Sequence, residues 1–225
     1  MHICLFDIDG TLLNTGGAGQ AAMEATLEAE FGVTAPTEGI STAGRTDRGI
    51  TADLFRYHGL GDGDDIHQRF LSAYCEHLPQ QLQQRDGLVL PGVPELLDRL
   101  SSRDDVTLGL LTGNFEVGEQ LKLEFYGLHH YFDFGGFGDR HVHRDDVAHE
   151  ALAEVHQRHN DSVDMNRVWV IGDTPADVQC GRAIGAKVVA VATGMFEYQV
   201  LEAAKPDHLF VDFADAEPLL GLLES

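Results

Sequence analysis

The segment FDIDGT occupies residues 6–11 and continues the short apolar run HICLFD at residues 2–7. An apolar run of this length with a polar stop predicts a buried β-strand. Asp7 and Asp9 follow the apolar residues directly, and Gly10 lets the chain turn sharply behind them. In open α/β sheets, functional groups gather beyond the carboxyl ends of the strands. The segment therefore predicts a functional site with two carboxylates where the first strand ends.

Four later segments have the same near-continuous apolar character, which is typical of strands that are covered on both faces of a parallel sheet. Helical periodicity separates them, so strands and helices alternate along the chain. The sequence therefore predicts an α/β fold, with a Rossmann-like parallel sheet and helices on both faces. The four segments are VTLGLLT (106–112), RVWVIGD (167–173), KVVAVAT (187–193) and DHLFVD (207–212).

Residues 15–88 interrupt this alternation, because they contain helical patterns and no convincing strand. One helix is expected from about Asp47 to His58. An ordinary crossover between strands is much shorter than this stretch. We therefore expect an inserted all-helical cap domain at residues 15–88 and a catalytic core made of residues 1–14 and 89–225. The glycine-containing segments that flank the insert are the expected hinges.

The composition limits the possible partners. The chain has 225 residues, and its 37 acidic against 15 basic residues give a formal net charge of -22. Such a surface repels nucleic acid and anionic membranes. No apolar run is long enough to cross a bilayer, and the first residues lack a signal-type pattern. We expect a cytoplasmic protein without a nucleic-acid or membrane partner, and the oligomeric state is left open.

Polar residues follow the first strand and the strands predicted near residues 110 and 170. Their carboxyl ends should meet at one sheet edge, which would crowd several carboxylates together. Carboxylates this close resist joint ionisation unless a cation relieves the repulsion, and Mg²⁺ suits a sparse carboxylate site that also holds phosphate. The residues expected at this edge are Asp7, Asp9, Gly10, Thr11, Thr112, Gly113, Asn114, Asp173 and Asp177.

Three ordered motifs, DIDGT (7–11), LLTGN (110–114) and GDTPAD (172–177), resemble those of the haloacid dehalogenase superfamily. The resemblance covers essentially the whole chain, and the insert is similar to the superfamily's helical cap. It implies a Mg²⁺-dependent phosphatase for a small phosphate monoester, with an aspartyl-phosphate intermediate, and the layout is similar to the phosphoglycolate phosphatase branch. Two alternatives remain open: a sugar-phosphate mutase of the β-phosphoglucomutase type, and a non-catalytic binding protein on the same fold.

The resemblance also implies roles for the aspartates. Asp7 would be the nucleophile, and Asp9 would be the general acid and base. An acid at the second position is typical of phosphate-ester hydrolysis rather than of dehalogenation. Asp7, the backbone carbonyl of Asp9 and Asp173 would hold Mg²⁺. Asp177 would bind the metal through water or fix neighbouring groups, and its alternative role is to complement a helix dipole.

The resemblance further implies which residues bind the phosphoryl group. The Thr112 hydroxyl and the Gly113 amide would contact its oxygens. Gly10 would bring backbone amides close to the phosphate. Thr11 would orient Asp9 or contact the phosphate, and Asn114 would contact the phosphate or cap the helix that follows it.

The superfamily places a basic residue, commonly a lysine, between its second and last motifs. No lysine lies between Lys122 and Lys187 in this chain. We predict that Arg144 takes this role, because it directly precedes a helical pattern and an arginine can grip phosphate with two nitrogens. Arg140 is the alternative.

The segment STAGRTDRGI at residues 41–50 combines small residues with two arginines ahead of a predicted helix. It is similar to cap loops that reach toward the active site in this branch of the superfamily. We expect Arg45 to contact a second anionic group of the substrate and so to influence substrate specificity.

Overall fold

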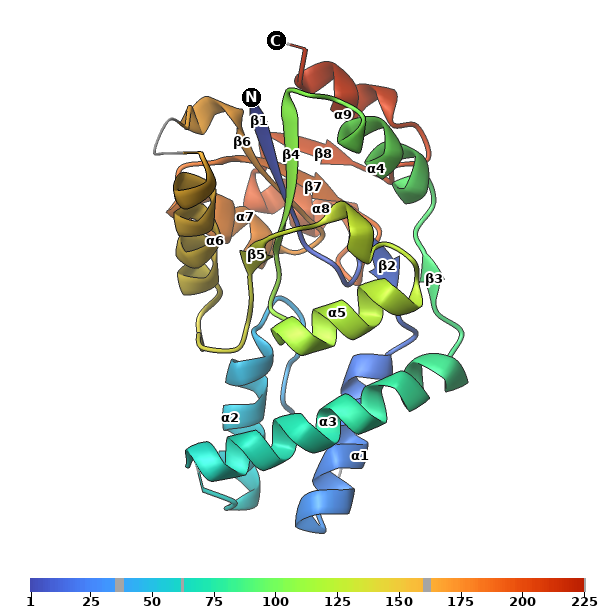
Figure 1. Cartoon of the computed structure of the whole chain (residues 1–225), viewed down its shortest axis with the longest axis vertical. Coiled ribbons are helices and arrows are strands. Elements are labelled where there is room, and N and C mark those ends of the chain that lie inside the picture. Colours follow the sequence, from blue (N-terminus) through green and yellow to red (C-terminus); the bar gives the residue numbers. More distant parts are fainter. Residues whose placement is uncertain (35–38, 62, 160–162, 225) are drawn as a thin grey trace.

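The computed structural model describes residues 1–34, 39–61, 63–159 and 163–224. These residues form a six-stranded, all-parallel sheet in the order β5-β4-β1-β6-β7-β8 (Figure 1). The predicted fold class is confirmed, and each predicted segment contains a strand. The short edge strand β5 was not predicted. The strands are β1 (His2–Phe6), β4 (Val106–Leu111), β5 (Gly135–Gly136), β6 (Val168–Gly172), β7 (Lys187–Val191) and β8 (His208–Phe210).

Strand β1 lies in the middle of the sheet and is buried along its whole length. Because side chains alternate along a strand, Cys4 and Phe6 face one apolar layer and Ile3 and Leu5 face the other. Helices α4 (Val93–Ser101) and α9 (Glu217–Leu222) contribute to the first layer, and α6 (Arg144–Arg158) and α7 (Pro175–Ala183) contribute to the second. Helix α8 (Tyr198–Ala204) packs against α7 and β7. Both faces of the sheet are therefore covered.

Residues 15–88, called the helical insert below, contain α1 (Ala18–Phe31), α2 (Asp47–His58) and α3 (Asp64–Gln84). These helices lie beyond the carboxyl ends of β1 and β4 (Figure 1) and share an apolar cluster to which Phe115 of the core also contributes. Both connections to the core pass through β2 (Leu13–Asn14) and β3 (Leu88–Val89), which pair antiparallel. The domain boundaries stay a prediction, and this two-stranded ribbon lies where they were placed.

Helix α5 (Glu116–Phe125) lies between the sheet and the helical insert (Figure 1). Val117, Leu121 and Phe125 recur every four residues in the sequence, which predicts a helix here, and the helix is confirmed. Its buried face is different, because Phe125 is 47% exposed and Val117 and Leu121 are only partly buried. The apolar period marks a helix, but it does not reveal a face that lines a polar cleft. That buried face consists of Gly118, Glu119, Lys122 and Leu123.

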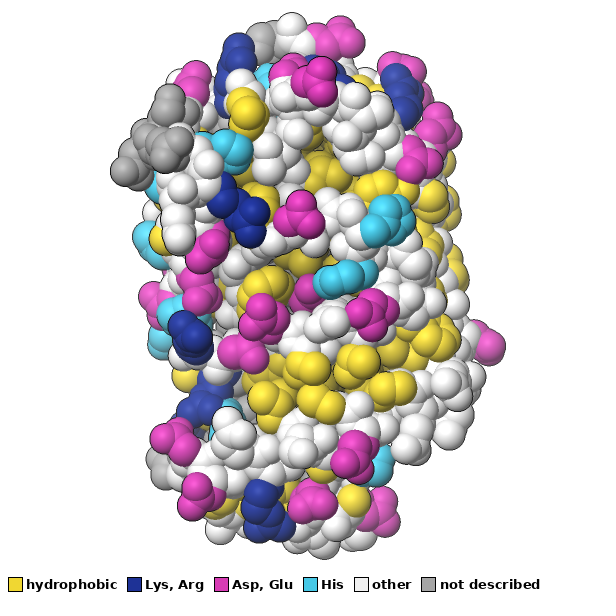
Figure 2. All heavy atoms as spheres, viewed as in Figure 1, with side chains coloured by type: hydrophobic (Ala, Val, Ile, Leu, Met, Phe, Trp, Pro, Cys, Tyr) yellow, Lys and Arg dark blue, Asp and Glu magenta, His cyan; other side chains and the backbone are white. Residues whose placement is uncertain are grey.

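The surface reflects the acidic composition. Figure 2 shows Asp and Glu side chains scattered over the whole visible face, with fewer Lys and Arg side chains between them. No helix among the described residues is both long and apolar enough to span a bilayer.

Candidate active site

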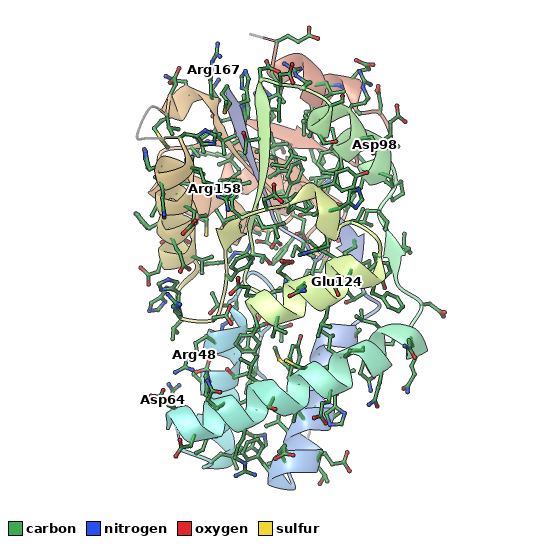
Figure 3. The ribbon with its side chains drawn as sticks, viewed as in Figure 1. Arg48, Asp64, Asp98, Glu124, Arg158 and Arg167 are labelled. Carbon is green, nitrogen blue, oxygen red and sulfur yellow. The ribbon has the colours of Figure 1, made fainter. Side chains whose placement is uncertain are left out.

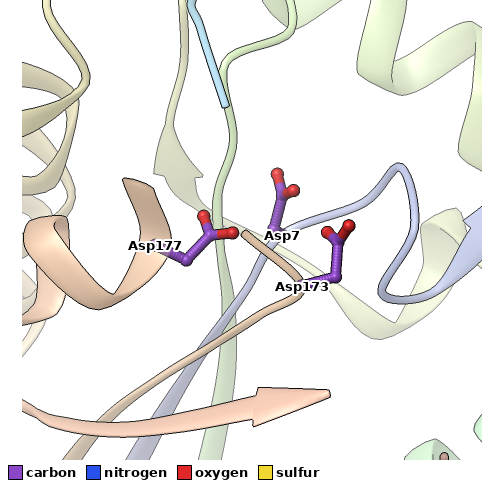
Figure 4. Close-up of side chains that lie close together, drawn as sticks. All are labelled: Asp7, Asp173 and Asp177. Atoms are coloured by element: carbon purple, nitrogen blue, oxygen red, sulfur yellow. The ribbon is translucent and has the colours of Figure 1, made fainter. Parts of the chain in front are cut away.

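Three aspartates converge where β1 and β6 end side by side (Figure 4). Asp7 directly follows β1, Asp173 directly follows β6, and Asp177 lies in the first turn of α7. All three are buried, and each offers one oxygen that lies within 4.8 Å of the oxygens of the other two. The parallel register of neighbouring strands thus brings together residues that are about 165 positions apart in the chain, as the sequence predicted.

Asp173 sits in a recess that requires glycine on two sides. Gly10 has a φ of +88°, and a Cβ atom there or at Gly194 would overlap the Asp173 carboxylate. Thr11 donates a hydrogen bond from Oγ1 to Asp173 Oδ1 at 3.2 Å. Thr11 was expected to orient Asp9 or to contact phosphate, and its observed partner is Asp173 instead. Because Gly10 has no side chain, the turn after β1 can lie directly against the Asp173 carboxylate.

Asp177 has most of its hydrogen-bonding capacity engaged inside the protein. Its Oδ2 accepts bonds from the backbone N–H of Thr174 at 2.9 Å and from the Thr174 hydroxyl at 2.7 Å, in a capping box at the start of α7. Its Oδ1 accepts a bond from Arg144. This arrangement favours the expectation that Asp177 fixes neighbouring groups.

Arg144 reaches the carboxylates from the first residue of α6. Its side chain is 8% exposed, and its Nη2 lies 3.1 Å from Asp7 Oδ1 and also contacts Asp177. Arg140 is exposed on the loop before α6. The structure therefore brings Arg144 to the predicted nucleophile, and it leaves Arg140 outside.

Burial and mutual repulsion disfavour charge on these acids. Burial, assisted by the nearby Asp177 and Asp9, raises the pKa of Asp7 to about 6, although Arg144 opposes the shift. Burial raises the pKa of Asp173 to about 9, with Asp177 and Asp7 adding to the effect. A divalent cation between Asp7 and Asp173 would offset both causes, so the residues present fit a hard metal ion.

Asp9 belongs to a second hydrogen-bonded group, which includes Lys122 and Asn114. Its Oδ2 accepts bonds from Lys122 Nζ at 2.6 Å and from Asn114 Nδ2 at 2.9 Å. Asn114 also accepts a bond from Lys122 at 2.5 Å and donates one to Thr112 Oγ1 at 2.8 Å. Asn114 was expected to contact phosphate or to cap α5. Its side chain instead connects Thr112, Asp9 and Lys122.

Lys122 was missed as a site residue by the sequence analysis. Its side chain is only 4% exposed, although it carries a charge and lies in the second half of α5. The available signal was its position one helical turn after Gly118, because a small residue there leaves room for a neighbouring element to approach. Buried lysines are rare unless they are paired, which makes the contact with Asp9 informative.

A cavity of about 410 Å³ separates this edge of the sheet from the helical insert. The insert closes it tightly, since a Cβ atom at Gly113 would overlap the backbone carbonyl of Arg45. Asp47 donates its backbone N–H to the Gly113 carbonyl at 2.6 Å, and its carboxylate accepts a bond from the Phe115 N–H at 2.9 Å. Burial raises the pKa of Asp47 to about 6, with Lys122 opposing the shift. The loop that follows β4 is thus held partly by the insert.

Arg45 lines the cavity, but its guanidinium group is bound within the helical insert. Its Nη2 donates to Asp53 at 2.7 Å and to the Gly49 carbonyl at 3.1 Å, and its Nη1 donates to the Ser41 carbonyl at 3.2 Å. The role of Arg45 in specificity therefore stays a prediction. Arg48 and Arg158, which Figure 3 shows along one flank of the molecule, do not line the cavity.

The chain is thus an α/β protein with a parallel sheet, an acidic cluster at the carboxyl edge of that sheet, a buried arginine on the first aspartate and helices that cover the cavity, an arrangement that suits an enzyme with an anionic substrate. Residues 4–191 match the family described as haloacid dehalogenase-like hydrolase, and the chain belongs to this family. The predicted enzyme class, a haloacid dehalogenase-like phosphoric monoester hydrolase, is confirmed.

Two curated relatives are similar over nearly their full length. A phosphoglycolate phosphatase from Agrobacterium fabrum is 26% identical, with 97% of this chain and 91% of the relative covered. The pyrophosphatase PpaX from Oceanobacillus iheyensis is 23% identical, with 96% and 95% covered. Among solved structures, CbbY from Rhodobacter sphaeroides in complex with phosphate superimposes with a TM-score of 0.74 at 21% identity, and both chains are covered completely. This last similarity supports the fold.

Proposed function

We propose that the protein is a Mg²⁺-dependent phosphatase that hydrolyses small phosphate monoesters through an aspartyl-phosphate on Asp7. The observation that carries the proposal is the position of Asp7, which contacts Arg144 and lies close to Asp173 at the floor of the cavity. The cavity volume suits a small metabolite, and the relative named phosphoglycolate phosphatase supports a substrate of this size.

The carboxylates of Asp7 and Asp173 and the backbone carbonyl of Asp9 would hold Mg²⁺, because hard oxygen donors match this ion. When bound, the ion supplies positive charge that offsets the charge of the phosphoryl group and of the aspartates. Arg144, whose Nη2 lies 3.1 Å from Asp7 Oδ1, supplies further positive charge. The carboxylate of Asp177 orients Arg144 and is not needed as a direct ligand.

In the first step, a carboxylate oxygen of Asp7 forms a bond to phosphorus while the bond from phosphorus to the alcohol oxygen breaks. Asp9 gives its proton to that leaving oxygen. Asn114 donates two hydrogen bonds from its side chain, one of them to Thr112 Oγ1. This contact orients the Thr112 hydroxyl so that its own proton is directed to a phosphoryl oxygen.

In the second step, the Asp9 carboxylate takes a proton from a water molecule. The water oxygen bonds to phosphorus, and the acyl-phosphate bond breaks to return the Asp7 carboxylate and inorganic phosphate. Lys122 and Asn114 hold Asp9 in place for both steps, since each contacts the same oxygen of its carboxylate.

Release of phosphate from p-nitrophenyl phosphate tests the proposal. We expect turnover with Mg²⁺, loss of turnover with EDTA, and recovery when Mg²⁺ is restored. Asp7→Asn should abolish turnover because an amide is a poor nucleophile, whereas Asp9→Asn should lose steady turnover and still allow phosphate to be trapped on Asp7. Full activity of Asp7→Asn would exclude the covalent mechanism. The mutase alternative predicts dependence on a sugar bisphosphate rather than steady phosphate release.

A further inference from the structure

Tyr74 is a buried polar residue of the helical insert that the mechanism above does not use. It comes from α3, lines the cavity and is 0% exposed. Its hydroxyl has no hydrogen-bond partner among the residues that the structure describes. A buried hydroxyl without a partner loses its hydration without compensation, so it points to a ligand atom at this position.

The ring of Tyr74 is fixed by its surroundings, so its hydroxyl cannot turn to another partner. Phe70 stacks on it with ring centres 6.2 Å apart, and Phe115 packs edge-on at 5.9 Å. A Cβ atom at Gly118 would lie only 3.2 Å from the Tyr74 ring. The glycine thus leaves room for the ring between the insert and α5, where Tyr74 lines the cavity.

A second donor faces the same part of the cavity. A Cβ atom on Gly19 would lie 3.8 Å from the Tyr74 hydroxyl and 3.4 Å from Lys122 Nζ, so both atoms border the space beside Gly19. The Lys122 ammonium group carries three hydrogens and uses two of them on Asp9 and Asn114. Burial, with a smaller contribution from Asp47, raises the pKa of Tyr74 well above its ordinary value, so the hydroxyl keeps its proton and can donate.

We propose that Tyr74 determines substrate specificity by donating a hydrogen bond to an oxygen atom on the alcohol part of the substrate. The inference rests on the proposed phosphatase function, because it needs the phosphoryl group to lie at Asp7. It defines the substrate class as phosphate monoesters of short alcohols that carry a second oxygen, either a hydroxyl or a carboxylate. Both chemistries present the acceptor that a hydroxyl and an ammonium group recognise.

Tyr74→Phe tests this inference because it removes one oxygen and keeps the ring. We compare kcat/KM for 2-hydroxyethyl phosphate, 2-phosphoglycolate and ethyl phosphate, which share a two-carbon chain and differ in the second oxygen. The unsubstituted protein should prefer one or both oxygen-bearing esters over ethyl phosphate, and Tyr74→Phe should reduce that preference about tenfold, the scale of one lost hydrogen bond. Tyr57→Phe is the matched control, because Tyr57 lies on α2 and is 65% exposed.

A larger loss of the kcat/KM preference for 2-hydroxyethyl phosphate identifies the acceptor as a hydroxyl, and a larger loss for 2-phosphoglycolate identifies it as a carboxylate. Either result supports the inference. An equal change for all three esters, or no change, would overturn it. Calorimetric binding of the same esters to Asp7→Asn, with and without Tyr74→Phe, separates this inference from the proposed function. If binding shows a Tyr74-dependent preference but the unsubstituted protein turns over none of the esters, the specificity role is retained and the phosphatase is refuted. Turnover without such a preference would do the reverse.

Discussion

Replacing Lys122 with methionine would remove a buried charge from the predicted acid and base while largely retaining the volume of the side chain. Lys122 is 4% exposed and lies 2.6 Å from Asp9 Oδ2, so the contact is a charge-assisted hydrogen bond. Such bonds contribute about 1.5–3 kcal/mol. Because the Asp9 side chain is 40% exposed, water screens the pair, and the lower part of that range, about 1.5–2 kcal/mol, is appropriate.

This energy corresponds to a loss of about 10–30-fold in a step that depends on a correctly oriented Asp9. An alkyl phosphate needs a proton on its leaving oxygen, whereas p-nitrophenolate departs without one. We therefore expect Lys122→Met to lower kcat/KM about 10–30-fold for ethyl phosphate and to change it much less for p-nitrophenyl phosphate. Lys122→Arg should recover part of the loss, because it restores a charged donor.

We measure kcat/KM of each variant with both substrates by steady-state kinetics. A thermal melt of each variant checks that it is folded. Lys205→Met is the control, because it makes the same lysine-to-methionine change at an exposed residue that ends α8 and does not line the cavity. Equal losses on the two substrates would refute the reasoning, since a role in orienting Asp9 must depend on the leaving group.

Three further predictions concern single side chains. Arg144→Ala should lower kcat/KM for p-nitrophenyl phosphate by about 10²-fold, the effect of losing one oriented stabilising group; Arg144→Lys should recover part of it, and Arg140→Ala should have little effect in the same assay. Arg45→Ala should raise KM for 2-phosphoglycolate more than for p-nitrophenyl phosphate, and equal changes would mean that Arg45 serves only to bind Asp53 within the insert. Burial raises the pKa of Glu119 from 4.5 to about 7, so between these pH values the folded protein keeps a proton that the unfolded chain has lost, and its free energy of unfolding falls as pH rises. Glu119→Gln removes this loss. Denaturant melts should show the variant equal to the unsubstituted protein near pH 4.5 and about 1–2 kcal/mol more stable above pH 7, a conservative fraction of the full pKa shift.

The strands and the carboxylates at their ends were predictable because their signals are local. Each apolar run is contiguous, and Asp7, Asp9 and Asp173 directly follow such runs. Once parallel strands are predicted, their common edge follows from topology, which is why residues so distant in sequence could be grouped. Arg144 was predictable for a similar reason, since it begins a helix next to the sheet.

Lys122 and Tyr74 could not be recognised in the same way. A lysine in a helix and an aromatic residue on an apolar helical face have ordinary explanations as a solvated side chain and a core residue. Their function depends on how the helical insert lies against α5, which is set by contacts between segments and not by either helical pattern. From the sequence, Asp47 is likewise interpreted as an acid in the first turn of a helix. In the structure its carboxylate accepts a hydrogen bond from the Phe115 N–H.

The bond from Phe115 to Asp47 links the order of the loop after β4 to the position of the helical insert. The backbone of that loop is bonded to Asp47 of the insert at two positions: the Gly113 carbonyl accepts from the Asp47 backbone N–H, and the Phe115 N–H donates to the Asp47 carboxylate. If the insert moved away, these partners would be lost, and the loop that carries Thr112 would be less constrained. Thermodynamic linkage then requires reciprocity: a ligand that orders the loop must favour the closed insert by the same free energy with which closure favours that ligand. A phosphate-bearing molecule would therefore contribute to closing its own site, even where it makes no contact with the helices above it.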